Sequence, residues 1–371
     1  MRNLPPALRP TALQARVLVA ALSDRPDVAR RAWRDALVET SLDELGNVAF
    51  ELLPLVSRNV NLPEADPGLP RLKGVHRRTW VKNNLLVGRT KGTAAALADA
   101  GIRPLFVEGV VLAARFYPEV GLRPTSVVDL LVDARDHDAA AAALGRAGWR
   151  QPPGTRPRRD GVEYFFDVDR NTCALWTTPA SDAIARGRGS APLGAATEHH
   201  PLDGVDVTVP TATETLFVVV VRHARLAAPG NVQWIVDAKL IVAAGVDWQR
   251  LIMLGDAYGQ LPRIRDALEL LARLPGASAP AEVRAELDRR RGDGRARLAY
   301  VCTNGTLTGP GRLPALVADH VAETADRSVL GAIATFPRFL RRRWGLARGR
   351  DVPRAVGARA LRYLRGRRSA A

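Results

Sequence analysis

The middle of the chain changes its hydrophobic period several times, and this change limits the folds open to it. Short apolar segments with strand character alternate there with helical segments, as in a sheet covered by helices. The predicted strands are 104–107, 126–132, 162–168, 172–177 and 205–209, with predicted helices at 110–117 and 136–148. The turn-forming residues 169–171 predict that strands 162–168 and 172–177 pair as a hairpin. We expect a mixed α/β sheet domain over residues 71–210.

Helical patterns lie on both sides of this domain. Residues 11–60 are predicted to be helical, with a capping-box spacing at Ser41 and Glu44 and an apolar stripe after it. Residues 62–70 contain three prolines and a glycine and are interpreted as a linker before a helix at 76–100. A second capping-box spacing, Thr211 and Glu214, opens a helical series: to about 226, then 232–244, 248–258, 263–274, 281–291 and 313–323.

The expected fold class is therefore α+β, a mixed α/β sheet domain flanked by N- and C-terminal helical regions. The expected units are an N-terminal helical region (1–70), the sheet domain (71–210), a C-terminal helical domain (211–335) and an Arg-rich tail (336–371).

The basic charge is concentrated in that tail. The chain has 54 Lys and Arg against 38 Asp and Glu, a net charge of +16, and residues 338–371 contribute twelve arginines and one acid, or +11. Apolar residues at helical spacing alternate with the arginines: Phe336, Phe339, Leu340 and Trp344. Three roles stay open: packing on the protein itself, binding an anionic membrane surface or acidic partner, and binding nucleic acid. Sequence-specific nucleic acid binding is disfavoured, because base-stacking aromatics are sparse.

The cysteine content and hydropathy bear on the compartment. Two cysteines, Cys173 and Cys302, are too few for a disulfide framework. No segment approaches the roughly 18 consecutive apolar residues that span a bilayer. We expect a cytoplasmic protein, with peripheral association at the membrane as an alternative that the tail keeps open.

The segment 104–150 carries the most informative motifs, and it resembles the uncharacterised nucleotidyltransferase family of the DNA polymerase beta superfamily. Family members have a Leu-Lys-Gly turn after a strand, an Arg-containing loop, and an Asp-x-Asp pair on the next strand; the corresponding residues here are 107–109, Arg123, and Val127 with Asp129. The resemblance continues through 221–242, which contains His223 and Asp237, and covers about residues 40–340 in order.

The resemblance implies a nucleotidyltransferase-like domain that transfers a nucleoside monophosphate from a magnesium nucleoside triphosphate to a hydroxyl of a small molecule, sugar or protein. Asp129 would be a catalytic residue and the Mg²⁺ ligand. Gly109 would let phosphates approach the backbone, and Arg123 would contact phosphate. His223 and Asp237 would support the site.

The sequence departs from the family pattern where the chemistry is carried. Val127 replaces the first Asp, Glu108 replaces the Lys, and residues 172–176, TCALW, lack the expected polar residues of a later strand. A rearranged metal pair of Glu108 and Asp129 is one hypothesis. A catalytically silent relative that binds a ligand or partner is a second, and a membrane-surface adaptor acting through the tail is a third.

Each remaining candidate has a structural alternative. Arg123 could instead anchor its loop, His223 could be a core histidine with a satisfied hydrogen bond, and Asp237 could cap a helix or pair with Arg222 or Arg225. Asp167 and Asp169 have the i, i+2 spacing of a metal pair but suit a hairpin turn better. The remaining polar candidates are expected to be structural: His199 and His200 in a surface loop, and Cys173 as a small buried hydrophobe.

Overall fold

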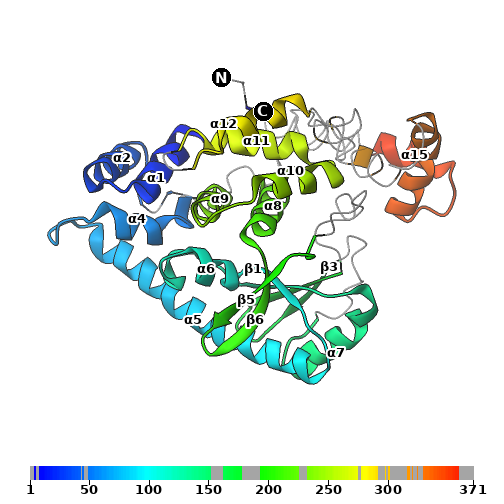
Figure 1. The fold of residues 1–371 in the computed structure, drawn as a ribbon, viewed down its shortest axis with the longest axis horizontal. Coiled ribbons are helices and arrows are strands. Elements are labelled where there is room, and N and C mark those ends of the chain that lie inside the picture. The colour runs from blue at the N-terminus through cyan, green and yellow to red at the C-terminus, as the bar shows by residue number, and fades with distance from the viewer. Residues whose placement is uncertain are drawn as a thin grey trace.

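The computed structural model describes residues 4–5, 8–42, 44–45, 49–151, 162–177, 193–224, 232–274, 277–290 and 329–358, with 297, 300, 316–317, 320 and 324. Figure 1 shows a sheet with long helix α5 and α7 on one side and a helical layer on the other. The fold class is α+β, as predicted from the sequence.

Among the described residues of the N-terminal region, the helices with given bounds are α1 (Ala12–Leu22), α2 (Pro26–Glu39) and α4 (Leu53–Val60). Ser41 and Glu44 make both reciprocal hydrogen bonds of the predicted capping box, each 3.3 Å long. The helix predicted to follow directly is wrong for residues 42, 44 and 45, which form a turn and a bend, whereas residues 49–50 are helical. Helix α4 begins only at Leu53, where Pro54 fits the first turn because its missing N–H is not needed there.

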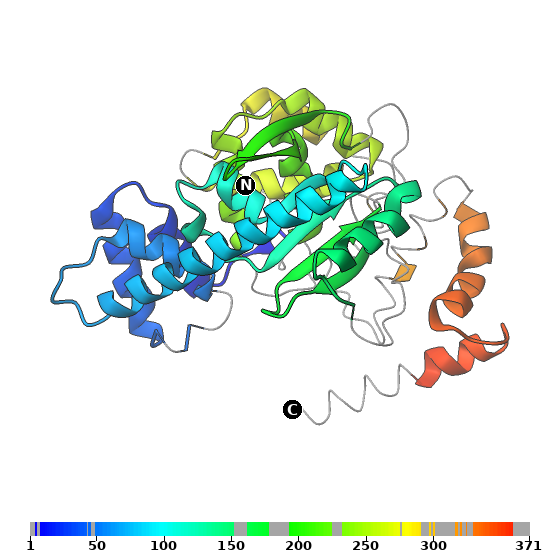
Figure 2. The same ribbon diagram turned by 90° about the horizontal axis from the view of Figure 1, so that it is seen from below.

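Helix α5 (Leu69–Asp99) runs for 31 residues beneath the sheet, and Figure 2 shows it extending from the N-terminal helices across the sheet domain. It begins seven residues before the predicted start at 76, so the predicted linker is shorter than 62–70. Pro70, which the linker interpretation included, lies in the first turn of α5, where proline is tolerated.

The main sheet has the order β1-β2-β4-β3, formed by β1 (Leu105–Gly109), β2 (Val127–Leu131), β4 (Thr172–Trp176) and β3 (Val162–Phe166). Strands β2 and β4 are parallel, and the two outer pairs are antiparallel. The predicted hairpin is confirmed as β3 and β4. Its turn is stabilised by Asp167, which accepts hydrogen bonds from the backbone N–H groups of Asp169 and Asn171. Asp167 and Asp169 therefore serve a turn, as their structural alternative predicted.

Short helices connect the strands: α6 (Val110–Phe116) and the 3-10 turn η2 (Val120–Leu122) join β1 to β2, and η3 (Ala134–Asp136) leads into α7 (His137–Arg146). Cys173 on β4 is fully buried, as predicted, and burial raises the pKa of its thiol well above the ordinary value.

A second hairpin, β5 (Thr197–Leu202) and β6 (Val205–Pro210), lies against β1. Its two turn residues, Asp203 and Gly204, both have positive φ, which suits the right-handed twist of a tight hairpin. The prediction that His199 and His200 lie in a loop is wrong, because both belong to β5. The strand is polar and largely exposed, so it lacks the apolar alternation that identifies a strand from sequence.

The C-terminal helical layer consists of α8 (Ala212–His223), α9 (Gln233–Ala243), α10 (Trp248–Ala257), α11 (Leu261–Leu271) and α12 (Ala281–Arg289). Thr211 caps α8 as predicted, but Glu214 does not complete the capping box. Its fully buried carboxylate accepts hydrogen bonds from the backbone of Gly194 and the side chain of Arg250, at 2.8 and 2.7 Å. The predicted helix 313–323 lies mostly outside the described residues.

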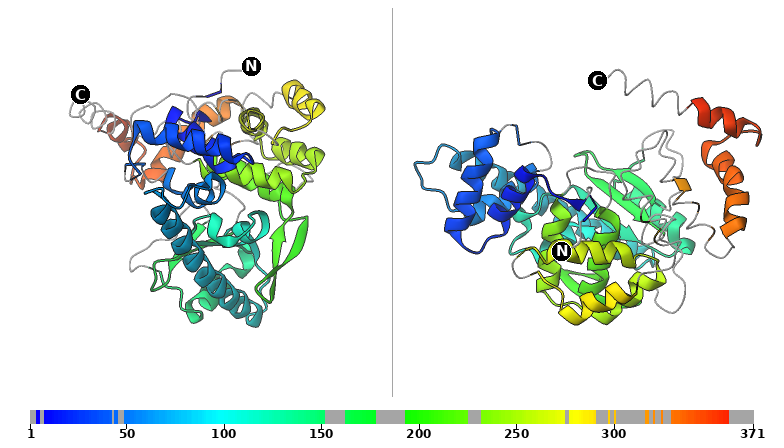
Figure 3. Two further views of the ribbon diagram at one scale, coloured as in Figure 1. Left: turned by 90° about the vertical axis from the view of Figure 1, so that its left-hand side faces the viewer. Right: turned by 90° about the horizontal axis from the view of Figure 1, so that it is seen from above.

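One hydrophobic core joins the N-terminal helices to the C-terminal layer. It includes Trp33 of α2, Leu53 of α4, Phe217 of α8 and Leu268 of α11. A second core lies between the sheet and the helices α5 and α7. The flanking helical regions, far apart in sequence, thus pack together over one side of the sheet, as Figure 3 also shows.

Helix α15 (Val329–Trp344) lies at the periphery of the molecule (Figures 1 and 2). It buries Phe339 and Leu340 in a small cluster with Leu316 and Val352, while its arginines are exposed. Within the described residues, none of the helices combines the length and the apolarity needed to cross a membrane.

Candidate functional site

The turn after β1 fixes the position of Glu108. Gly109 has φ of +74°, and a Cβ there would lie 2.0 Å from the carbonyl oxygen of Val127 on β2. Only glycine fits this close approach of two backbones. The turn ends β1 and starts α6, so that Glu108 lies beside β2 at the level of Asp129.

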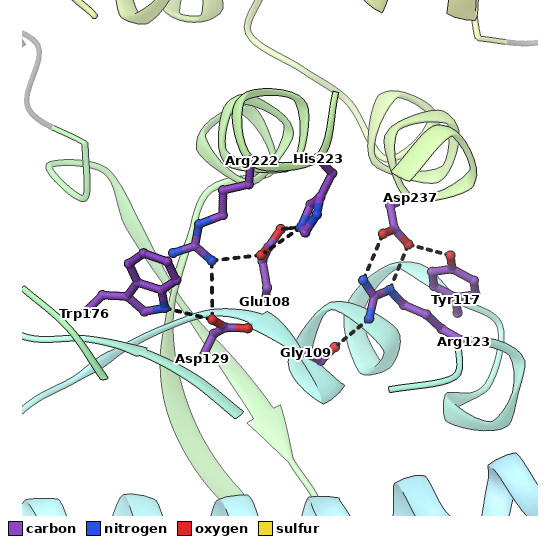
Figure 4. Close-up of polar contacts among 9 residues, drawn as sticks. All are labelled: Glu108, Gly109, Tyr117, Arg123, Asp129, Trp176, Arg222, His223 and Asp237. Carbon is purple, nitrogen blue, oxygen red and sulfur yellow. Dashed lines mark hydrogen bonds and ion pairs between the residues drawn. The ribbon is translucent and has the colours of Figure 1, made fainter. Parts of the chain in front are cut away.

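Glu108 and Asp129 are both buried, and one cation lies between them. Nη1 of Arg222, at the end of α8, donates to Glu108 Oε2 across 2.8 Å and contacts Asp129 Oδ1 at 3.4 Å. Figure 4 shows the guanidinium reaching down from α8 to both carboxylates. The two predicted catalytic acids are thus brought together, and Arg222 occupies the position between them.

Two further side chains complete this cluster. His223 Nε2 lies 3.0 Å from Glu108 Oε1, and Trp176 Nε1 on β4 donates to Asp129 Oδ1 across 2.9 Å. The Arg222 guanidinium also stacks 4.1 Å from the centroid of the Trp176 ring, a cation–π contact. Its Nε and Nη2 atoms are buried and have no hydrogen-bond partner among the described residues. The indole ring therefore supports the guanidinium that bridges the acids.

The electrostatics of the two acids differ. Burial would raise the pKa of Glu108, but His223 and Arg222 outweigh it and hold this pKa well below the ordinary value. Burial, together with the repulsion from Glu108, raises the pKa of Asp129 although Arg222 opposes the shift. Burial would lower the pKa of His223, but the Glu108 carboxylate raises it above the ordinary value. Glu108 is the ionised partner of both cations, and Asp129 is the weaker acid.

A second cluster anchors the loop between β1 and β2. Arg123 Nε and Nη2 donate to the two oxygens of Asp237 on α9, across 2.8 and 2.9 Å, and Nη1 reaches the Gly109 carbonyl at 3.4 Å. Tyr117 donates to Asp237 across 2.5 Å, and Gln233 donates to the Tyr117 hydroxyl. Asp237 thus pairs with Arg123. This buried fork is the loop-anchoring arrangement that the sequence left open for Arg123.

The two clusters do not fit a magnesium ion in their present arrangement. Magnesium requires near-octahedral oxygen ligands. Both oxygens of Glu108 already accept from His223 or Arg222, Asp129 Oδ1 accepts from Trp176, and Val127 offers no oxygen on the strand face that it shares with Asp129. The described residues contain no group of three or more potential His, Cys, Asp or Glu ligands.

A cavity of about 410 Å³ lies beside the start of β2, between α5 and residues 50–51. Val127 and Arg123 line it, so the cavity adjoins the residue at which the resemblance predicts the first family Asp. Asn83 of α5 shapes this region, since its amide donates to the carbonyls of Val120 and Arg123 across 2.5 and 2.7 Å.

The sequence identified most of these positions but missed several partners. Glu108, Asp129 and His223 come together in one cluster, and Gly109, Arg123 and Asp237 in the other. The site residues not predicted from the sequence are Trp176, Tyr117, Gln233 and Asn83. Arg222 was expected only as a possible partner of Asp237, which pairs with Arg123 instead. A signal existed for Arg222, because it is a charge at the end of the otherwise apolar run 216–221.

These features define a nucleotidyltransferase-like protein whose carboxylate site contains an arginine. The chain belongs to the uncharacterised nucleotidyltransferase family, whose model matches residues 49–276 and thus more than half of the chain. The family resemblance seen in the sequence is thereby confirmed, although the match ends before residue 340. No curated protein and no solved structure matches the chain.

Proposed function

We propose that this chain is a catalytically silent member of the family, which binds a nucleotide without transferring its nucleotidyl group. One observation carries the proposal: the guanidinium of Arg222 lies between Glu108 and Asp129, 2.8 and 3.4 Å from their oxygens. A fixed cation on a buried helix end occupies the space where carboxylates of the family would hold metal. Family membership and the neighbouring cavity support nucleotide as the ligand.

The residues around the Arg222 guanidinium hold it in its position between the two acids. Arg222 is buried, is supported by the Trp176 ring, and neutralises a carboxylate whose pKa is held low. Moving Arg222 away would leave Glu108 with His223 alone, and removing one partner from a buried ion pair is costly. The contacts of the cluster thus favour a fixed arrangement of Arg222 between the two acids.

Mg²⁺-dependent transfer of a nucleoside monophosphate to a hydroxyl acceptor is the second candidate. The convergence of Glu108 and Asp129 on one cation favours it, since two acids facing one point could exchange an arginine for a metal. It requires Arg222 to leave both carboxylates when the nucleotide binds.

Thermal unfolding and label transfer separate these two functions. We expect a nucleoside triphosphate that binds to stabilise the protein in EDTA as well as in Mg²⁺, because the proposed binding uses no metal. At 100 times its Kd, such a ligand adds about 2.7 kcal/mol to the free energy of unfolding. No label should pass from an α-³²P nucleotide to any acceptor. Transfer that needs Mg²⁺, persists in Asp133→Asn and disappears in Asp129→Asn would favour the second candidate. Asp133 is the matched control because it is an exposed acid just after β2.

The tail supports a separate proposal of peripheral membrane binding. Since Phe339 and Leu340 are buried, the exposed apolar residues of α15 are Leu330 and Ile333, at 79% and 65% exposure. Exposed arginines follow them along the helix, an arrangement that suits an anionic lipid surface. Sedimentation with phosphatidylserine liposomes tests this: Leu330→Ser with Ile333→Ser should reduce the bound fraction, and equal binding by wild type and variant would count against it.

A further inference from the structure

The cavity beside β2 is lined by charged and polar residues that do not belong to the carboxylate cluster. Its volume of about 410 Å³ falls within the range of small-molecule sites. The lining residues that matter here are Phe50, Val75, Arg78, Lys82 and Ser126. Val75, Arg78 and Lys82 follow one side of α5 over seven residues, which is about 10 Å of helix.

Arg78 and Lys82 are the exposed cations in the lining of the cavity. They are four residues apart on α5, so their side chains are neighbours, and both are exposed. In the part of the chain that the structure describes, neither makes an ion pair. Like charges at this spacing repel each other, and an anion bound between them would remove that repulsion. By contrast, Arg123 also lines the cavity but is already paired with Asp237.

Hydroxyl groups line the same cavity as these cations. Thr125 Oγ1 accepts from the Val127 N–H at 3.3 Å, which leaves its O–H free to donate. The Ser126 hydroxyl is half-buried and makes no hydrogen bond to any described residue. A cavity lined by two cations and two hydroxyl donors suits a phosphoryl group, whose oxygens accept several charge-assisted hydrogen bonds.

Two apolar side chains also line the cavity. Phe50 is 39% exposed, and Val75 lies one turn of α5 before Arg78. Glu51 is half-buried beside them, and burial raises the pKa of its carboxyl although Arg123 opposes the shift. A ligand that spans the cavity therefore needs an apolar or planar part with a hydrogen-bonding group as well as a phosphoryl group.

We propose that this cavity binds an organic phosphate, with the phosphoryl group at Arg78 and Lys82 and the organic part against Phe50 and Val75. The inference deepens the proposed function and rests on it where the organic phosphate is a nucleotide. A sugar phosphate belongs to the same ligand class, and the experiment separates the two sources.

Calorimetric titration of the full-length protein with ATP, glucose 6-phosphate and tripolyphosphate tests the inference. Arg78→Ala with Lys82→Ala should weaken binding of the phosphate ligand at least tenfold. The matched control is Lys73→Ala with Arg77→Ala, which removes the same charge from exposed positions of α5 outside the cavity and should change the Kd less than twofold. Circular dichroism verifies that both double variants stay folded.

A variant at Phe50 separates the contribution of the organic part of the ligand from that of its phosphoryl group. Phe50→Ala should weaken the binding of ATP or glucose 6-phosphate, because each has an organic part. It should leave the Kd of tripolyphosphate unchanged, because that probe has none. Binding of glucose 6-phosphate but not ATP, lost with Arg78 and Lys82, would support the cavity and contradict the nucleotide function. Equal ATP binding by both double variants would overturn the cavity and leave the nucleotide function standing. Failure of all three probes to bind the wild type would overturn both.

Discussion

Arg123 and Asp237 form a bidentate ion pair that connects the loop before β2 to helix α9. Both contacts are shorter than 3 Å, at 2.8 and 2.9 Å, and both side chains are almost fully buried. The pair joins segments 114 residues apart in the sequence. It is therefore a direct link between the sheet domain and the C-terminal helical layer.

Removing Asp237 should destabilise the protein strongly. Asp237→Ala leaves the Arg123 guanidinium buried without its counter-charge, and we expect the free energy of unfolding to fall by about 3–5 kcal/mol. The control is Asp133→Ala, which loses only an exposed contact with Arg135 and should cost less than about 1 kcal/mol. Urea denaturation measures both values. Equal losses in the two variants would show that the buried pair contributes no more to the free energy of unfolding than the exposed contact does.

The turn at Gly109 should tolerate no side chain. Gly109→Ala combines positive φ with a clash against the Val127 carbonyl, and we expect it to cost more than about 4 kcal/mol or to prevent folding. Gly101 has a similar φ of +73° but no atom within 4 Å of its Cβ position. Gly101→Ala should therefore cost only the backbone strain of about 1–2 kcal/mol. Circular dichroism and denaturant midpoints compare the two, and similar midpoints would contradict the close approach.

The His223 and Glu108 pair should make stability depend on pH. Because the folded-state pKa of His223 is raised, its stabilisation is complete below the ordinary value of 6.5 and is lost as pH rises through the folded-state pKa. Because the pKa of Glu108 is lowered, its stabilisation is present above its ordinary value of 4.5 and is lost as pH falls through the folded-state pKa. The pair should stabilise most between about pH 4.5 and 6.5.

His223→Gln tests this pH dependence. The variant should lose the decline in unfolding free energy above pH 6.5 that the wild type shows. His199→Gln is the control, since His199 is largely exposed on β5 and touches neither Glu108 nor Asp129. Denaturation curves from pH 5 to pH 9 give the slopes. A wild-type slope that survives in His223→Gln would assign it to another group.

A metal site should appear when the Arg222 cation is removed and a third carboxylate is added at position 127. Val127→Asp adds an acid two residues before Asp129 on the same strand face, and Arg222→Ala removes the cation between the acids. We expect the double variant to bind Mn²⁺, measured by electron paramagnetic resonance, and Val127→Asp alone to bind at least tenfold more weakly. Tight Mn²⁺ binding by the wild type, abolished in Asp129→Asn, would contradict the assigned role of Arg222.

The sequence predicted the elements that carry strong local signals. The strands around Phe106, Leu130 and Leu175 are short apolar runs bounded by turn residues, and the Asp167 turn has the residues that favour it. The start of α5 and the strand with His199 were missed. Proline is compatible with both a linker and a first helical turn, and a polar edge strand has no apolar alternation.

The sequence alone predicted an α+β fold and, through its resemblance, membership of the nucleotidyltransferase family, and both are confirmed. The same resemblance predicts that one family Asp, the Lys and the polar strand residues are replaced. Only the tertiary structure decided what fills the altered site. Arg222 is 93 residues from Asp129 in the sequence, and the direction of its side chain depends on how α8 docks over the sheet. Such long-range contacts follow from the packing of whole elements, which local sequence patterns do not specify.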